Sequence, residues 1–145
     1  MKIYLAARYS RHDEMQGVRD VLRVLGHAVT SRWIDCHTDI VGEHGVSCTP
    51  EQLNEDTANC AMLAMHDLSD IDDADTMISF TAEQDGTKGG RHVEFGIGLA
   101  MGKRMILVGP RQHVFHTLPE VEHYPSWWGL AYALAGERDA MDALL

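Results

Sequence analysis

The sequence predicts an α/β protein built on a doubly wound parallel sheet with helices on both faces. Two observations carry this prediction. Short apolar runs rich in β-branched residues alternate along the chain with longer segments in which apolar residues recur at helical spacing. Such alternation is typical of parallel strands joined by crossover helices. The chain has 145 residues, and we expect residues 1–145 to form a single domain of this Rossmann-like kind.

Four apolar runs have the length and composition of buried strands. In a doubly wound sheet, ligands bind beyond the carboxyl ends of the strands, so the loop after each run is a candidate site. The predicted strands are Lys2–Ala7, His27–Trp33, Thr76–Thr81 and Arg104–Val108.

Helices are predicted between the strands and after the last one. The first carries Met15, Val18 and Leu22 at helical spacing and stops at Gly26. The second begins at Thr49, which with Gln52 forms a capping box around a proline at the first helical position. The remaining boundaries are an end near Asp70 for the second helix, a third helix over Arg91–Gly102, a long loop over Ile34–Cys48 and a helical tail from about Ser126.

Composition excludes several classes of partner. The formal net charge of −10 argues against binding to a nucleic acid polymer, which requires a basic face. No apolar run approaches the roughly 20 residues of a membrane span, so no membrane partner is expected. The cysteines, Cys36, Cys48 and Cys60, are sparse and odd in number, which favours a reducing cytoplasm over a disulfide-rich setting.

The most informative segment is the glycine-rich loop that leads into Glu94. Glycines before a helix let a ligand approach the backbone, and the helix dipole stabilises an ionised carboxylate in or near the first turn. Gly90, Glu94 and Gly98 repeat every four residues and share one helix face, which leaves the carboxylate sterically open. Equally, the glycines can serve tight helix–sheet packing while Glu94 is solvated.

A second group of carboxylates precedes the third predicted strand. Cleavage of a glycoside through a covalent intermediate uses two carboxyl groups with different roles, one of them attacking carbon 1. The pattern alone does not choose which aspartate would accompany Glu94. The candidates are Asp67, Asp70, Asp72, Asp73 and Asp75.

Several short motifs, in a fixed order, resemble those of the nucleoside 2-deoxyribosyltransferase family over roughly residues 3–118. That family includes transferases that exchange bases between deoxynucleosides and hydrolases of 2′-deoxynucleoside 5′-monophosphates. The motifs are Tyr4 in the first strand, Asp67-Leu68-Ser69-Asp70-Ile71 with Ala74-Asp75, Gly86-Thr87-Lys88-Gly89-Gly90 with Glu94-Phe95-Gly96, and Gly102-Lys103-Arg104.

The resemblance implies the roles of three catalytic residues. Glu94 would be the nucleophile that forms a glycosyl ester, and Asp67 would contact the sugar hydroxyls and position that glutamate. The phenol of Tyr4 would hydrogen-bond the nucleophile; from the pattern alone it is equally a core tyrosine. The resemblance implies no cofactor and no metal.

The resemblance also places the substrate. The hydrolases hold the 5′-phosphate with the first loop and the loop before the nucleophile, and add a hydroxyl residue from a neighbouring subunit. This favours deoxynucleoside monophosphates as substrates and a homodimer or larger homo-oligomer; base exchange between deoxynucleosides is the alternative. Position 88 departs from the hydrolase pattern, which has a small hydroxyl residue there. The corresponding residues are Arg8, Ser10, Arg11, Lys88, Gly90 and Thr117.

Base recognition and two further hypotheses stay open. Trp33 can stack on a base or pack in the core, and Arg32 or Asp35 can read the edge of a base. A nucleotide-binding sensor on the same fold is not expected to carry both Asp67 and Glu94. A zinc site in the long loop has suitable residue types but no common ligand spacing, and would use Cys36, His37, His44 and Cys48.

Overall fold

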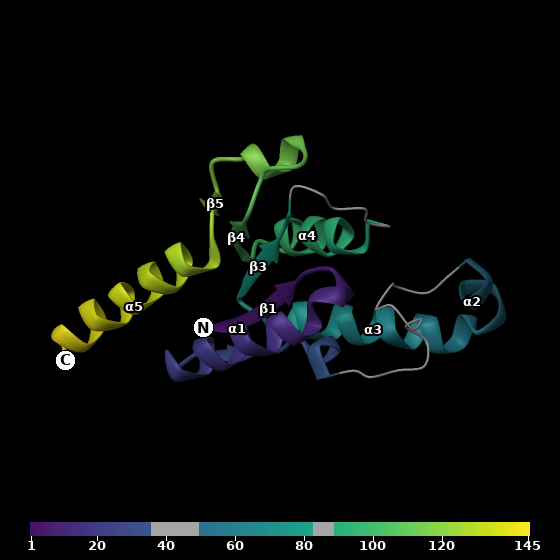
Figure 1. Cartoon of the computed structure of the whole chain (residues 1–145), viewed down its shortest axis with the longest axis horizontal. Coiled ribbons are helices and arrows are strands. Elements are labelled where there is room, and N and C mark those ends of the chain that lie inside the picture. The colour runs from purple at the N-terminus through teal and green to yellow at the C-terminus, as the bar shows by residue number, and fades with distance from the viewer. Residues whose placement is uncertain (36–49, 83–88) are drawn as a thin grey trace.

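A parallel sheet of five strands forms the centre of the computed structural model, which describes residues 1–35, 50–82 and 89–145 (Figure 1). Every pair of neighbouring strands is parallel, and the spatial order is β2-β1-β3-β4-β5. The predicted fold class, a doubly wound α/β sheet, is therefore confirmed. The strands are β1 (Lys2–Ala6), β2 (Ala28–Val29), β3 (Thr76–Phe80), β4 (Arg104–Val108) and β5 (Val121–Tyr124).

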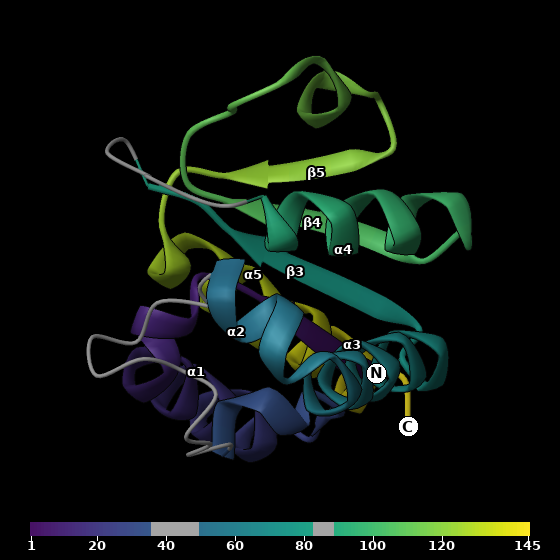
Figure 2. The ribbon, with the colours of Figure 1, turned by 90° about the vertical axis from the view of Figure 1, so that its right-hand side faces the viewer.

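Helices cover both faces of this sheet (Figure 2). The helices α1 (His12–Val24) and α5 (Trp127–Ala143) pack on one face, and α3 (Thr57–Asp73) and α4 (Gly90–Ala100) on the other. A short helix, α2 (Pro50–Glu55), precedes α3. Within the described residues, no helix combines the length and the apolarity that crossing a membrane requires. The described part of the chain also contains three short 3₁₀ turns: η1 (Tyr9–Arg11), η2 (Arg32–Asp35) and η3 (Val114–Thr117).

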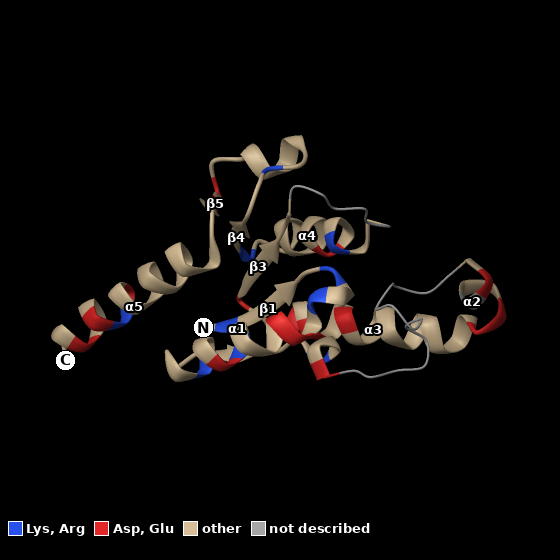
Figure 3. Cartoon of the chain, in the orientation of Figure 1, with Lys and Arg blue, Asp and Glu red and all other residues tan. Residues whose placement is uncertain are grey.

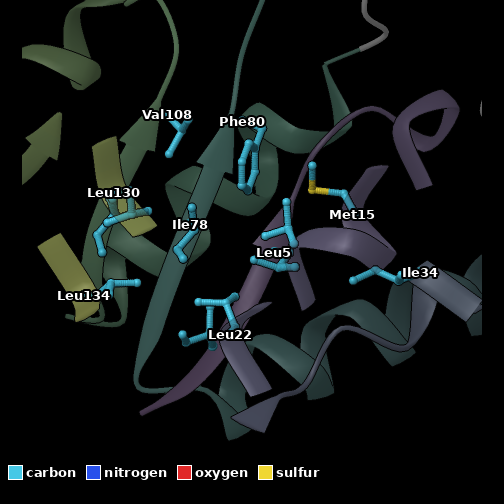
Figure 4. Packing of buried hydrophobic residues seen from close by; sticks show 12 residues of the cluster. Leu5, Met15, Leu22, Ile34, Ile78, Phe80, Val108, Leu130 and Leu134 are labelled. Carbon is cyan, nitrogen blue, oxygen red and sulfur yellow. The ribbon is translucent and has the colours of Figure 1, made fainter. Parts of the chain in front are cut away.

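The alternation of side chains along β1 divides the core into two clusters. Ile3 and Leu5 point to the α1 and α5 side, whereas Tyr4 and Ala6 point to the α3 and α4 side, as the period of two in a strand requires. Figure 4 shows the first cluster, in which Leu5 and Ile78 of the sheet lie among side chains of α1 and α5. A strand buried on both faces has no side facing solvent, which explains the largely apolar runs in the sequence.

The second predicted strand is mostly wrong. His27–Trp33 was expected to be extended, but only Ala28–Val29 pairs with β1. The Thr30 amide still donates to the Ile3 carbonyl over 2.9 Å. Side-chain bonds then take over: the Thr30 hydroxyl donates to the Asp70 carbonyl over 2.8 Å, and the buried Ser31 hydroxyl accepts from the Leu5 amide over 2.6 Å. Serine and threonine compete with regular structure in this way. The chain then turns into η2, which places Trp33 beside the end of β1.

Two other boundaries differ from the sequence prediction. The helix expected to run to about Asp70 is divided at Asp56 into α2 and α3, and it continues to Asp73. The sequence did not reveal β5, because Val121-Glu122-His123-Tyr124 is short and carries polar residues at its centre. By contrast, Arg104–Val108 is a strand with both predicted ends confirmed.

The strand order defines where a ligand would bind. The connections run in opposite directions from β1, to β2 on one side and to β3 on the other. The carboxyl ends of β1 and β3 therefore flank the switch point of the sheet, which is the usual ligand site in this architecture. The residues directly after β1, residues 81–82 after β3 and the start of α4 lie at this edge of the sheet.

Candidate active site

Tyr4 and Glu94 are joined by a hydrogen bond at the centre of the molecule. Tyr4 lies in the middle of β1 on the α3 and α4 side, and its residue is fully buried. Its hydroxyl donates to Oε1 of Glu94 over 3.0 Å. Glu94 lies in the second turn of α4 and keeps part of its surface accessible. A buried phenol therefore holds a carboxylate that a ligand can still reach.

Asp67 brings a second carboxyl group to the same point from α3. Its carboxyl group lies close enough to Tyr4 and Glu94 for each of them to shift its pKa. The two helices lie side by side on this face of the sheet, so residues from separate elements converge above β1 (Figure 2). Asp67, like Glu94, is partly accessible. The structure thus brings together the three residues predicted to be catalytic.

The environment of this pair opposes the presence of two full charges. Burial, and then the negative charge of Asp67, raise the pKa of Glu94; a hydrogen bond from Tyr4 opposes that rise. Burial, and then the charge of Asp70, raise the pKa of Asp67. When two carboxyl groups lie close together, the state with one proton between them is favoured over the state with two negative charges. The two groups therefore titrate as a pair. Burial and the neighbouring carboxylates also raise the pKa of Tyr4, so its phenol remains a neutral donor.

Asp70 forms the next layer of this site. It is buried and accepts from the backbone amide of Arg32 over 2.9 Å and from Nε of Arg32 over 2.8 Å. The charge of Arg32 lowers the pKa of Asp67. Asp67 and Asp70 lie three residues apart and therefore share one helix face. This spacing could have predicted from the sequence that the two carboxyl groups belong to the same site.

The other aspartates of the predicted group lie away from Glu94. Asp72 and Asp73 are exposed at the end of α3, where Asp73 pairs with Lys2 over 3.2 Å. Asp75 accepts from the backbone amide of Lys2 over 3.0 Å, at the amino end of the sheet. Only Asp67 and Asp70 of this group therefore contribute to the site.

The first loop supplies basic side chains at the carboxyl edge of the sheet. Figure 3 shows Lys and Arg in the turn between β1 and α1 and at the start of α4. Arg8 is half-buried and Ser10 is exposed. Arg11 pairs with both carboxylate oxygens of Glu14 over 2.8 Å, and its guanidinium lies 5.6 Å from the centre of the Phe80 ring. An anion recruiting Arg11 would therefore compete with Glu14.

The loop before α4 is described only at its end. Gly90 is the first residue of α4, and Gly89 before it has φ +90°, a left-handed conformation that favours glycine. None of the described side chains caps this helix end. Lys88 lies outside the described residues, as do the four residues weighed as a zinc site, Cys36, His37, His44 and Cys48.

The side chains considered for base recognition have defined partners. The Trp33 indole donates to the Leu5 carbonyl over 2.8 Å, and its ring centre lies 6.3 Å from that of Tyr9. Tyr9 in turn stacks on His12. Arg32 is paired with Asp70, as described above. Asp35 is paired with Arg19 over 2.6 Å. Trp33 and Tyr9 thus present two rings near the end of β1.

Two further residues named from the sequence lie on the opposite side of α4. Thr117 is exposed in η3, where its hydroxyl donates to the Val114 carbonyl over 2.7 Å. Arg91, the expected first residue of the third predicted helix, is buried and donates to the Gln112 side chain over 2.5 Å. Arg91 therefore contributes to packing between α4 and the segment after β4.

The fold and the carboxyl pair define the class of protein: a doubly wound α/β protein with an acidic site at the switch point of its sheet. Among the solved structures that share this fold, two are similar to this chain over most of its length. One is the CMP N-glycosidase BcmB of Clostridium botulinum, with a TM-score of 0.55 and 20% sequence identity over 92% of this chain and 98% of that one. The other is a 2-deoxyribosyltransferase of Bacillus psychrosaccharolyticus, with a TM-score of 0.64 and 22% identity over 92% of this chain and 96% of that one.

These likenesses extend over nearly the whole length of all three chains and show a shared fold. The name of the second protein agrees with the family that the sequence motifs resemble. No protein-family model matches this sequence, and no curated protein matches it.

Proposed function

We propose that this protein cleaves the N-glycosidic bond of 2′-deoxynucleoside 5′-monophosphates, releasing the free base and deoxyribose 5-phosphate. A carboxylate oxygen of Glu94 attacks carbon 1 of the sugar, and the bond from that carbon to the base nitrogen breaks. The base leaves with the bonding electron pair and takes up a proton. Water then opens the glycosyl ester, adding its hydroxyl to carbon 1 and regenerating the Glu94 carboxyl group. Asp67 orients the sugar and the nucleophile, and Tyr4 holds Glu94 through the bond described above.

The observation that carries this proposal is the contact between the two carboxyl groups. An inverting glycosidase keeps its carboxyl groups roughly 6.5–9.5 Å apart to leave room for a water molecule. Asp67 raises the pKa of Glu94 through its charge and through direct interaction of the two side chains, which fits a closer pair than that. Direct attack by one carboxylate fits this arrangement better than activation of a water held between them.

A second line of support comes from the proteins that share the fold. One is named as an N-glycosidase and the other as a deoxyribosyltransferase, and both names describe chemistry at the bond between a sugar and a base. The transition state of such a reaction carries positive charge at carbon 1. A sugar without a 2′-hydroxyl develops that charge more easily, which is consistent with a deoxy substrate.

The preference for a monophosphate rests on the first loop and the start of α4. Arg8 and the first turn of α4 lie at the same edge of the sheet, and the backbone N–H groups at the start of a helix favour an anion. We include Ser10, Arg11, Lys88 and Gly90 in this phosphate site. Base exchange between deoxynucleosides remains the alternative reaction, and a nucleotide sensor the non-enzymatic one.

We also propose that the protein acts as a homo-oligomer in which η3 contributes to a neighbouring site. Val114 and Phe115 of η3 and Val93 of α4 are exposed apolar side chains, with 75%, 58% and 63% of their surface accessible. Thr117 follows them in the same turn and would supply its hydroxyl to the partner's phosphate. Sedimentation that finds a fully active monomer would contradict this arrangement.

The reaction is tested by incubating the protein with deoxynucleosides, deoxynucleotides and CMP, and measuring free base by chromatography. Hydrolysis predicts base release from one or more monophosphates without any acceptor. Release that requires a second base would assign the transferase reaction instead. A folded protein that binds nucleotides and releases no base from any of them would assign the sensor role.

The phosphate site is tested by comparing dCMP with deoxycytidine, and the matched pairs for the other bases. One charge-assisted contact is worth roughly 1.5–3 kcal/mol, so each pair should differ by about tenfold to a hundredfold in kcat/KM. Lys88→Ala should reduce that ratio by slowing only the phosphorylated substrate. Equal kcat/KM values within every pair would move base exchange to first place.

A further inference from the structure

Three histidines from two separate segments meet beside α4. His92 lies in the first turn of α4, His113 directly precedes η3, and His116 lies within η3. Their ring nitrogens, one from each residue, all lie within 4.8 Å of one another. In the parts of the chain that the structure describes, this is the one group of three His, Cys, Asp or Glu side chains with such spacing.

Local geometry accounts for the pairing of two of these rings. In a 3₁₀ turn, side chains three residues apart lie directly above one another. The rings of His113 and His116 accordingly have centres 3.6 Å apart. The ring of Phe95 in α4 packs edge-on against both, with its centre 5.7 Å from that of His113 and 4.8 Å from that of His116. The cluster is therefore built on packed elements rather than on a free loop.

The closest approach within the cluster has the spacing of two ligands on one ion. His92 Nδ1 and His113 Nε2 are 3.2 Å apart. Two nitrogens that are each about 2.0–2.1 Å from a tetrahedral zinc ion lie roughly 3.3 Å from one another. A metal can thus replace the proton that these nitrogens share, with little movement of either ring.

The third ring has a nitrogen for which packing provides no partner. His116 is 1% exposed, and its Nδ1 accepts from the Gln112 backbone amide over 3.0 Å. The ring proton then resides on Nε2, and this atom is buried with no hydrogen-bond partner among the described residues. A buried polar group without a partner is rare and indicates a missing ligand or a functional role.

We propose that His92, His113 and His116 bind one divalent transition-metal ion, with zinc as the expected ion, and that this ion ties η3 to α4. Three neutral imidazoles and a solvent molecule make a four-coordinate site of the kind that zinc adopts. Imidazole ligands also suit cobalt and nickel, which serve as spectroscopic probes.

Two features oppose binding of the metal ion and limit the affinity of the three histidines for it. Coordination through His116 Nε2 moves the ring proton to Nδ1 and gives up the bond from Gln112. Arg91 lies beside the cluster, with Nη2 3.4 Å from His92 Nε2, and its charge disfavours a dication.

The consequence concerns the helix that carries Glu94. His92 precedes Glu94 by two residues, and Thr117 follows His116 directly. An ion held by these histidines would fix the start of α4 against the turn proposed to reach the neighbouring subunit. The site is separate from the carboxyl pair, and binding of the metal does not depend on the proposed reaction.

The test uses the full chain, stripped with a chelator and titrated with zinc chloride by calorimetry. We expect one ion per chain at this site, and a melting temperature that rises with zinc concentration because the ion binds the folded state. Cobalt should give the intense visible absorption of a tetrahedral centre. His92→Gln and His113→Gln each remove one metal ligand, and circular dichroism should show that each variant folds. Each should weaken zinc binding by more than 10- to 100-fold, which is the usual cost of losing a residue that only supports a ligand.

Controls separate this cluster from the other histidines of the chain. His27→Gln changes a histidine at the opposite, amino end of the sheet, and the double variant His37→Gln/His44→Gln changes two histidines outside the described residues. Both should bind zinc as the unchanged protein does. Imidazole nitrogen chemical shifts measured with and without zinc should move at positions 92, 113 and 116, which tests the site without any substitution. Absence of binding, normal binding by His92→Gln and His113→Gln, or shifts confined to other histidines would overturn the proposal.

Discussion

The hydroxyl of Tyr4, at the centre of β1, donates a 3.0 Å hydrogen bond to Oε1 of Glu94 in α4. This bond favours the ionised form of Glu94, whereas burial and the charge of Asp67 favour its protonated form. Because these influences on Glu94 oppose one another, a single substitution at either neighbour should shift the pKa of Glu94 in a defined direction.

Glu94→Gln should reduce base release by at least about 10⁴-fold, because an amide cannot replace a covalent nucleophile. Substrate binding and circular dichroism should stay close to those of the unchanged protein. Glu120→Gln, at an exposed position, is the matched control and should keep full activity. Activity of Glu94→Gln near that of the unchanged protein would mean that another group attacks carbon 1.

Asp67→Asn and Tyr4→Phe should move the pKa of Glu94 in opposite directions. Removing the Asp67 charge removes a cause of the raised pKa, so that pKa should fall. Removing the Tyr4 hydroxyl removes a donor to the carboxylate, so the pKa should rise. Carbon-13 spectroscopy of labelled glutamate measures both shifts directly.

The acid limb of kcat/KM should follow the same two directions, because that parameter reports the ionisation of the free enzyme. In the unchanged protein the limb belongs to the Asp67 and Glu94 pair as a whole. Shifts of the same sign in the two variants would contradict the described roles of these neighbours.

Glu94→Gln should also stabilise the protein at neutral pH. The raised pKa means that the folded state binds more protons than the unfolded chain between the ordinary glutamate pKa of about 4.3 and the raised value. The free energy of unfolding contributed by this group therefore falls as the pH rises through that window. Thermal melts at neutral pH should give the variant a free energy of unfolding about 0.5–2 kcal/mol higher than that of the unchanged protein. The difference should disappear below about pH 4.3, where both forms are uncharged; a constant difference at all pH values would point to packing instead.

Asp70→Asn should lower the free energy of unfolding by about 1–3 kcal/mol. The substitution weakens two bonds to Arg32, one of them from its backbone amide, at a buried position. Asp72→Asn, two residues along the same helix and exposed, is the control and should change stability by less than about 0.5 kcal/mol. Urea denaturation measures both variants, and equal effects would show that the Arg32 pair adds nothing to stability.

The sequence by itself determined the doubly wound architecture and the positions of most elements. Arg104–Val108 and the helix of Met15, Val18 and Leu22 were predicted correctly because each rests on a local hydrophobic pattern. The motifs also singled out Tyr4, Asp67 and Glu94, which the structure places in contact. Their catalytic roles remain predictions.

Only the tertiary structure decided the contacts between segments that lie far apart along the chain. The pattern did not choose Asp67 from five aspartates, did not pair Arg32 with Asp70, and predicted a long second strand where Thr30 and Ser31 end the ladder. It also gave no indication that His92 would meet His113 and His116. Periodicity records which face of an element is buried, whereas these contacts depend on how α3, α4 and the segment after β4 pack against the sheet, and that packing is set by many distant residues at once.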